Sequence, residues 1–245
     1  MNDMRIILTA SAFALLSAVP GLAASKFAAP KGCTVYQTVQ MRGCQLSQHY
    51  RCEGDAAGDQ WSVYLDANGP FYMSRIDAET RWMESFDLTT GEEDRIAKET
   101  DPASFSTLLE TGRDTYDFTT TSSNGEVRRY AGYDELTGET VVIDGVMLER
   151  TRFELTASGA DGQMLWQRTG QQLVQRDWRI FFADKEGFEN SFGDKADVTE
   201  TPVTFAGPGD KGFLAAKPEY DCDAMMTGDW LRDIIPARLE IGRAP

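Results

Sequence analysis

The four cysteines carry the clearest chemistry in this sequence: Cys33, Cys44, Cys52 and Cys222. An even number of cysteines is typical of disulfides in a protein that works in an oxidising compartment, and three pairings are possible. A zinc site or a redox pair is disfavoured, because the chain has no C-x-x-C motif and only one histidine. We therefore expect two disulfides.

The spacing around the first three cysteines favours one of the three pairings. Residues 33–41 and 44–52 both alternate in polarity and flank Arg42-Gly43, which predicts a hairpin with a two-residue turn. In that register Cys33 lies opposite Cys52, close to disulfide reach, and Met41 lies opposite Cys44. The expected bonds are Cys33–Cys52 and Cys44–Cys222.

Nucleophilic catalysis would have to use His49, the single histidine of the chain. Ser47 is on the same strand face, but residues at i and i+2 lie roughly 7 Å apart at Cα, too far for a catalytic pair. We expect His49 to be an ordinary surface residue. The sequence also has no G-x-S-x-G, H-E-x-x-H, P-loop or well-placed G-x-G-x-x-G motif, so we expect no catalytic motif, no cofactor and no metal site.

Glu84 is the acid that departs most clearly from its local pattern. It alternates with Trp82 and Phe86 and so is predicted to share their inward face. An inward acid could serve a glycosidase-like hydrolase that uses two carboxylates. The alternative is an acid paired with an arginine at the edge of the core. A further acidic segment, residues 184–194, could offer oxygen ligands to Ca²⁺, but its spacing does not match the D-x-[DN]-x-[DN]-G pattern, and we expect a solvated loop.

Four tryptophans lie on separate predicted strands: Trp61, Trp82, Trp166 and Trp178. If they line one concave face together with Glu84, they could bind a hydrophobic or aromatic small molecule. The alternative is that they are ordinary core residues of a β protein.

The elements that must position these residues are strands. Alternating segments of strand length recur with turn signals between them, and long helices are absent. One helix is predicted from Asp101 (N-cap) and Pro102 to Gly112, and a second over residues 227–235. The sequence predicts an all-β fold with one or two short helices, an antiparallel meander that forms an open barrel, a closed barrel or a sandwich.

The first 23 residues read as a secretory signal peptide, with a short n-region, an uncharged apolar stretch over 6–19 and small residues before cleavage after Ala23. Residues 24–245 are then expected to form a single disulfide-linked domain in the periplasm or outside the cell. No later segment is long and apolar enough to span a bilayer.

The charge limits the class of partner. With 24 Lys and Arg against 39 Asp and Glu, the formal net charge is −15, which argues against nucleic acid. A curved up-and-down sheet with a small helix resembles, in architecture only, the periplasmic lipoprotein carriers and the lipocalins, although Gly58-Asp59-Gln60-Trp61 lacks the lipocalin Gly-Trp spacing. We expect an exported, non-catalytic binding, carrier or envelope-associated protein; the alternatives are the carboxylate-dependent hydrolase and an acidic interaction protein that binds a basic partner.

Overall fold

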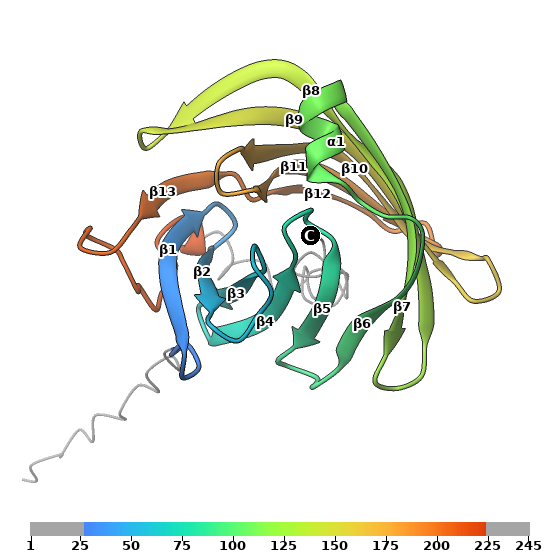
Figure 1. The fold of residues 1–245 in the computed structure, drawn as a ribbon, viewed down its shortest axis with the longest axis horizontal. Helices are drawn as coiled ribbons and strands as arrows, with labels where there is room; N and C mark the ends of the chain where they lie inside the picture. Colours follow the sequence, from blue (N-terminus) through green and yellow to red (C-terminus); the bar gives the residue numbers. More distant parts are fainter. Residues whose placement is uncertain (1–26, 224–245) are drawn as a thin grey trace, which may run out of the picture.

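The computed structural model describes residues 27–223, which form one antiparallel sheet of 13 strands with a short helix, α1 (Figure 1). The predicted signal peptide and the predicted helix over 227–235 lie outside the described residues. The strands are β1 (Cys33–Met41), β2 (Gln45–Cys52), β3 (Gln60–Asp66), β4 (Gly69–Ile76), β5 (Trp82–Asp87), β6 (Glu93–Asp101), β7 (Arg113–Ser122), β8 (Val127–Ile143), β9 (Val146–Gly159), β10 (Met164–Gln175), β11 (Ile180–Asn190), β12 (Lys195–Thr199) and β13 (Pro202–Ala206), and α1 is Phe105–Thr111.

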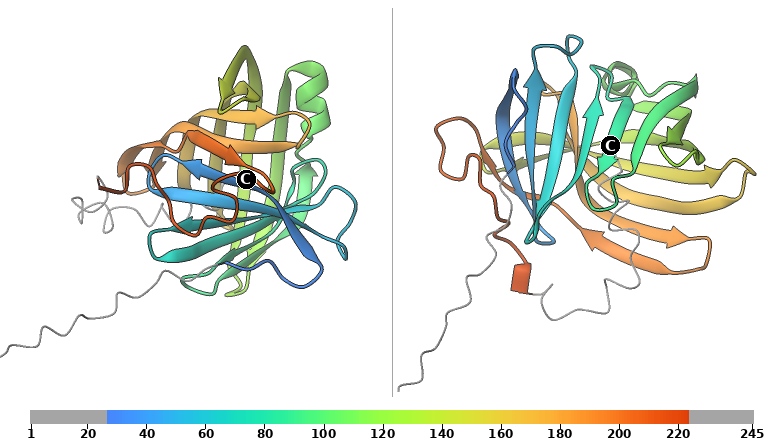
Figure 2. Two further views of the ribbon diagram at one scale, coloured as in Figure 1. Left: turned by 90° about the vertical axis from the view of Figure 1, so that its left-hand side faces the viewer. Right: turned by 90° about the horizontal axis from the view of Figure 1, so that it is seen from below.

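The strand order confirms the predicted meander. Strands β1 to β11 each pair with the next strand in the sequence, and β13 returns to pair with β1. The sheet curls on itself but stays open, with β12 and β13 as its two edges (Figures 1 and 2). None of the helical residues described forms a segment long and apolar enough to cross a bilayer.

The first hairpin has the predicted pairing at its open end and a different one at its turn. Cys33 lies opposite Cys52, as expected, but Met41 lies opposite Gln45 and not opposite Cys44. The turn has three residues, because Gly43 and Cys44 both adopt positive φ (74° and 56°). A bulge at Tyr36 takes up the extra residue, so the two departures compensate and the cysteine pair at the open end is preserved.

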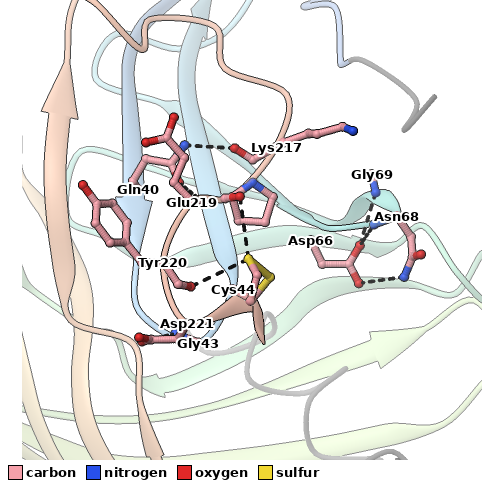
Figure 3. The surroundings of a disulfide bond; sticks show 12 residues. Gln40, Gly43, Cys44, Asp66, Asn68, Gly69, Lys217, Glu219, Tyr220 and Asp221 are labelled. Carbon is pink, nitrogen blue, oxygen red and sulfur yellow. Dashed lines mark hydrogen bonds between the residues drawn. A yellow bond between two sulfur atoms is a disulfide. The ribbon is translucent and has the colours of Figure 1, made fainter. Parts of the chain in front are cut away.

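Both predicted disulfides are present, Cys33–Cys52 and Cys44–Cys222, and they use all the cysteines of the chain. The second bond spans 178 residues and fixes the C-terminal segment against β1 (Figure 3). Gln40 on β1 reinforces it: its Nε2 donates to the Lys217 carbonyl at 3.0 Å, and its Oε1 accepts from the Glu219 N–H at 3.0 Å.

Helix α1 begins later than predicted. Ser104, and not Asp101, is its N-cap, because the Ser104 side chain accepts from the Thr107 N–H while Asp101 ends strand β6. Gly112 ends the helix as predicted, in the left-handed conformation (φ 84°) that glycine adopts most easily. The buried side of the helix is formed by Phe105 and Leu108.

The segment predicted as an acidic loop is largely strand. Residues 185–190 continue β11, and β12 follows after a short turn. Gly170 lies inside β10, where a Cβ atom would be 2.2 Å from the Lys185 carbonyl oxygen. Glycine thus allows β10 and β11 to approach closely at this point. Because residues 185–190 are part of a strand, the acids of this segment are spaced along β11 and are not gathered in a loop.

The core forms where the curled sheet meets itself. At the tip of the β10–β11 hairpin, Val174 and Phe181 pack against α1, whereas Leu173 and Phe182 pack against Val39 and other residues of β1, β9 and β13. Neighbouring residues of a strand point to opposite faces, so this tip is covered on both sides. A third cluster covers β1–β3 with residues from both ends of the described chain, including Phe27 and Phe213.

Candidate functional site

The four tryptophans do not share one face. Trp82 and Trp166 both belong to one aromatic cluster, where each packs on Tyr130 with ring centroids 5.1 and 5.9 Å away. Trp61 stacks on Tyr50 at 5.9 Å, in the cluster over β1–β3. Trp178 packs on Phe205 at 5.9 Å, in the cluster of the β10–β11 tip. Only Trp82 and Trp166 are therefore brought together as one candidate binding surface.

A small cavity lies beside Trp82, among the residues predicted to bind a ligand. Its volume is about 20 Å³, close to that of a single water site. The wall combines aromatic, aliphatic, hydroxyl and charged side chains: Tyr72, Ser74, Arg75, Ile76, Trp82, Glu84, Ser85, Asp94, Ile96, Thr120 and Tyr130. Two of the five predicted site residues, Trp82 and Glu84, thus line it.

The hydroxyl groups give this cavity its polar side. Ser74 and Ser85 lie opposite each other on β4 and β5. Thr120 is 4% exposed, and its Oγ1 has no hydrogen-bond partner among residues 27–223. A buried hydroxyl group without a partner is costly, so a water molecule or a small polar ligand next to Thr120 would stabilise the site.

Glu84 is held by two arginines. Its Oε1 accepts from Arg75 Nε at 2.8 Å, and its Oε2 accepts from Arg95 Nη1 at 2.5 Å. Arg75 also pairs with Asp59. The register explains the arrangement: a bulge at Met83, between Trp82 and Glu84, places Glu84 opposite Arg75 on β4, and Glu84 also lies opposite Arg95 on β6. To act as a general acid or base, Glu84 would have to give up charge-assisted hydrogen bonds.

A pair of buried acids was missed by the sequence analysis. Asp114 on β7 and Asp134 on β8 lie directly opposite each other, and each is 8% exposed. Burial raises the pKa of Asp134 to about 8, and the nearby charge of Asp114 adds to the rise. Burial likewise raises the pKa of Asp114 to about 6, although its carboxylate accepts from the Ser104 N–H at 2.7 Å. The pair therefore binds a proton near neutral pH.

The alternation of buried and exposed residues along β7 and β8 could have revealed this pair of acids. Asp114 is two residues before Tyr116, and Asp134 follows Gly132 by two, so both acids share the face of buried aromatic residues. Gly132 makes room for the Tyr116 ring, because a Cβ atom there would lie 3.0 Å from the ring and from its hydroxyl group. The low exposure of both acids leaves little surface for a substrate.

The prediction that His49 is an ordinary surface residue is wrong. It is 1% exposed because Phe182 of the β10–β11 tip packs edge-on against its ring at 5.6 Å. The hydroxyl oxygens of Ser47 and Ser62 lie 2.8 Å from Nε2 and Nδ1, so the side chains of Ser47 and His49 do meet, although their Cα separation was predicted to keep them apart. Burial lowers the pKa of His49 to about 3. The ring is therefore neutral, and one serine donates to it while the other accepts.

An ion pair is buried next to Trp166. Arg168 has no exposed surface, and its Nη2 lies 3.1 Å from Glu186 Oε1 on the neighbouring strand. The guanidinium carbon is 5.7 Å from the centre of the Trp166 ring. Among residues 27–223, no group of three His, Cys, Asp or Glu side chains is arranged to hold a metal ion.

Comparisons with models of protein families, with curated proteins and with solved structures gave no match.

Proposed function

We propose that this chain is an exported, non-catalytic binding protein of the periplasm or the extracellular space. The use of all four cysteines in two disulfides supports this location, because disulfides form and persist in oxidising compartments. The apolar N-terminal stretch over residues 6–19 supports it independently, since it has the features of a signal peptide.

The site by Trp82 supports binding at the surface more than carriage of a bulky ligand inside the sheet. Its cavity of about 20 Å³ is far smaller than the ~300–1,000 Å³ of drug-sized ligand sites. The aromatic cluster of Trp82, Tyr130 and Trp166 fills the space beside it. A hydrophobic or aromatic small molecule would have to displace these side chains to bind here, so we infer that this site carries no such ligand and that a partner is bound at the surface.

A carboxylate-dependent hydrolase is the second candidate, and Asp114–Asp134 is the observation that favours it. Paired acids with raised pKa values are typical of acid–base catalysis. Asp134→Asn and Asp114→Asn would abolish such an activity on chromogenic glycosides. No turnover by the wild-type protein with these glycosides would contradict the hydrolase.

Mass spectrometry of the protein from fractionated cells tests the proposed function. We expect a periplasmic or secreted species that begins at Ala24 and whose mass rises only after reduction and alkylation. A cytosolic species that begins at Met1 with four free thiols would overturn the location. Native mass spectrometry of the same sample tests the binding mode, because a stoichiometric small-molecule adduct would favour a carrier.

A further inference from the structure

The last strands of the sheet carry a groove on their outer face. Phe188 and Ala196 face the aromatic cluster that contains Trp166. Neighbouring residues of a strand point to opposite faces, so Gly187 and Asp197 face outward. The groove has a volume of about 290 Å³, close to the lower limit of small-molecule sites. It is lined by Gln167, Thr169, Gly187, Phe188, Glu189, Lys195, Ala196 and Asp197.

Gly187 leaves a notch in this groove. It lies opposite Thr169 of β10 on one side and Asp197 of β12 on the other. A Cβ atom at Gly187 would lie 3.6 Å from Asp197 Oδ1, and 3.9 Å from both the hydroxyl and the carbonyl oxygen of Thr169. The three nearest atoms are thus all oxygens. We call this place the Gly187 notch.

The side chains on the two sides of the notch are available to a ligand. Asp197 and Thr169 are exposed, and within residues 27–223 their side chains make no hydrogen bond or ion pair. The next acid along β11 differs, because Glu189 Oε2 is paired with Lys195 Nζ at 2.9 Å. Gln167 is also engaged, since its Nε2 donates to Glu154 Oε1 at 3.3 Å. The notch is therefore the part of the groove where a negative charge is not neutralised.

The chemistry of the notch selects a primary ammonium group. One unpaired carboxylate beside a hydroxyl matches a ligand with a single positive charge and several N–H donors. A divalent metal ion fits poorly, because Lys185 and Lys195 both lie on the same outer face, two residues from Gly187 and Asp197. The formal net charge of −15 favours the approach of a cation.

We propose that the Gly187 notch binds the primary ammonium group of a small polar molecule. The amine donates to the Asp197 carboxylate and to the Thr169 hydroxyl, and the rest of the molecule lies in the groove. This inference gives the proposed binding protein a ligand class, and it rests on that proposed function.

The probe is ethanolamine, titrated into the full-length mature protein with both disulfides intact and followed by NMR. We expect saturable shifts of the amide signals of Thr169, Gly187 and Asp197. Two matched ligands are the controls: ethylene glycol has a hydroxyl in place of the amine, and choline keeps the charge but has no N–H donor. Each should bind about tenfold more weakly or less. Shifts elsewhere only, no binding, or equal affinity for choline would overturn the proposal.

Variants make the test specific to the notch. Gly187→Ala fills it with a Cβ atom that meets its neighbours at ordinary contact distances, so the fold should be kept while affinity for ethanolamine falls about tenfold. Asp197→Asn should lower the affinity by a similar factor. A urea unfolding curve checks that both variants remain folded. Unchanged affinity in either folded variant would contradict the site.

The control variant is Asp177→Asn, which removes the same charge in the turn between β10 and β11, at the opposite end of that hairpin from Glu189. Its affinity for ethanolamine should stay within about twofold of the wild type, because charges so far apart are screened. A loss equal to that of Asp197→Asn would show attraction to the net charge alone and overturn the notch. A cytosolic location would refute the proposed function without changing any of these binding results.

Discussion

The first hairpin, β1–β2, and the end of the β8–β9 hairpin, residues 140–149 (the arm), are both antiparallel hairpins but are held in different ways. The hairpin is joined to itself by Cys33–Cys52 and to the C-terminal segment by Cys44–Cys222, and both of its faces are covered. The arm carries no covalent link, and Val142 and Met147 leave one of its faces exposed. The difference indicates that the covalent cross-links are concentrated at the first hairpin, whereas the arm is held on one face only.

Removal of the long disulfide should have the largest effect. Cys44→Ser with Cys222→Ser should lower the free energy of unfolding by about 5 kcal/mol, because this bond closes the longer loop. Cys33→Ser with Cys52→Ser, which opens a loop of 19 residues, should cost about 3 kcal/mol. Urea unfolding measures both, and a larger loss for the short loop would contradict the loop-length explanation.

His49→Gln should weaken the first hairpin and change its response to acid. Loss of the ring and its contacts with Ser47 and Ser62 should cost about 2 kcal/mol at pH 7. The folded state keeps the ring neutral down to about pH 3, whereas the unfolded state takes up a proton below about pH 6.5. The wild-type protein therefore loses stability as pH falls below 6.5. The variant should lose less between pH 6.5 and 5.5, and an equal loss in both proteins would refute the buried neutral ring.

Asp134→Asn should stabilise the base of the arm at alkaline pH. The folded state keeps the Asp134 proton up to about pH 8, whereas the unfolded carboxyl group releases it near pH 4, so wild-type stability falls as pH rises between these values. The variant should lack this decline and exceed the wild type by about 2 kcal/mol at pH 8. Asp117→Asn is the control on β7: Arg129 lowers the Asp117 pKa, so its loss should give no alkaline gain.

The smallest effect is expected on the exposed face of the arm. Val142→Thr with Met147→Thr should change the free energy of unfolding by no more than about 0.5 kcal/mol. Leu148→Ala is the buried control beside it, 1% exposed, and should cost about 3 kcal/mol. A thermal unfolding series compares them, and a large loss in the exposed double variant would mean that the face formed by Val142 and Met147 is buried in the folded protein.

Local alternation was sufficient to predict the meander, the two disulfides and the end of α1 at Gly112. It could not predict the bulge at Tyr36, because one extra residue in the turn and one in the strand cancel at Cys33–Cys52. The burial of His49 depends on Phe182, more than 130 residues away, which no local pattern reveals.

The candidate site was predicted less well, for a similar reason. Glu84 and Trp82 were expected to share a face, but a bulge between them changes the register. Trp61 and Trp178 were grouped with Trp82 because each alternates on its own strand, yet curling of the sheet places them in separate clusters. Asp114 and Asp134 could have been found by the same alternation, had acids in strands been paired as well as aromatic residues.

The bond between Cys44 and Cys222 makes nearly the whole described chain a covalent ring, which contains strands β2 to β13. A single cut by a protease anywhere within this ring would release no fragment. The nicked chain would keep its full mass on a non-reducing gel and separate into two pieces only after a thiol reductant was added. A protein on the cell exterior could in this way remain one molecule after an exposed turn has been cleaved.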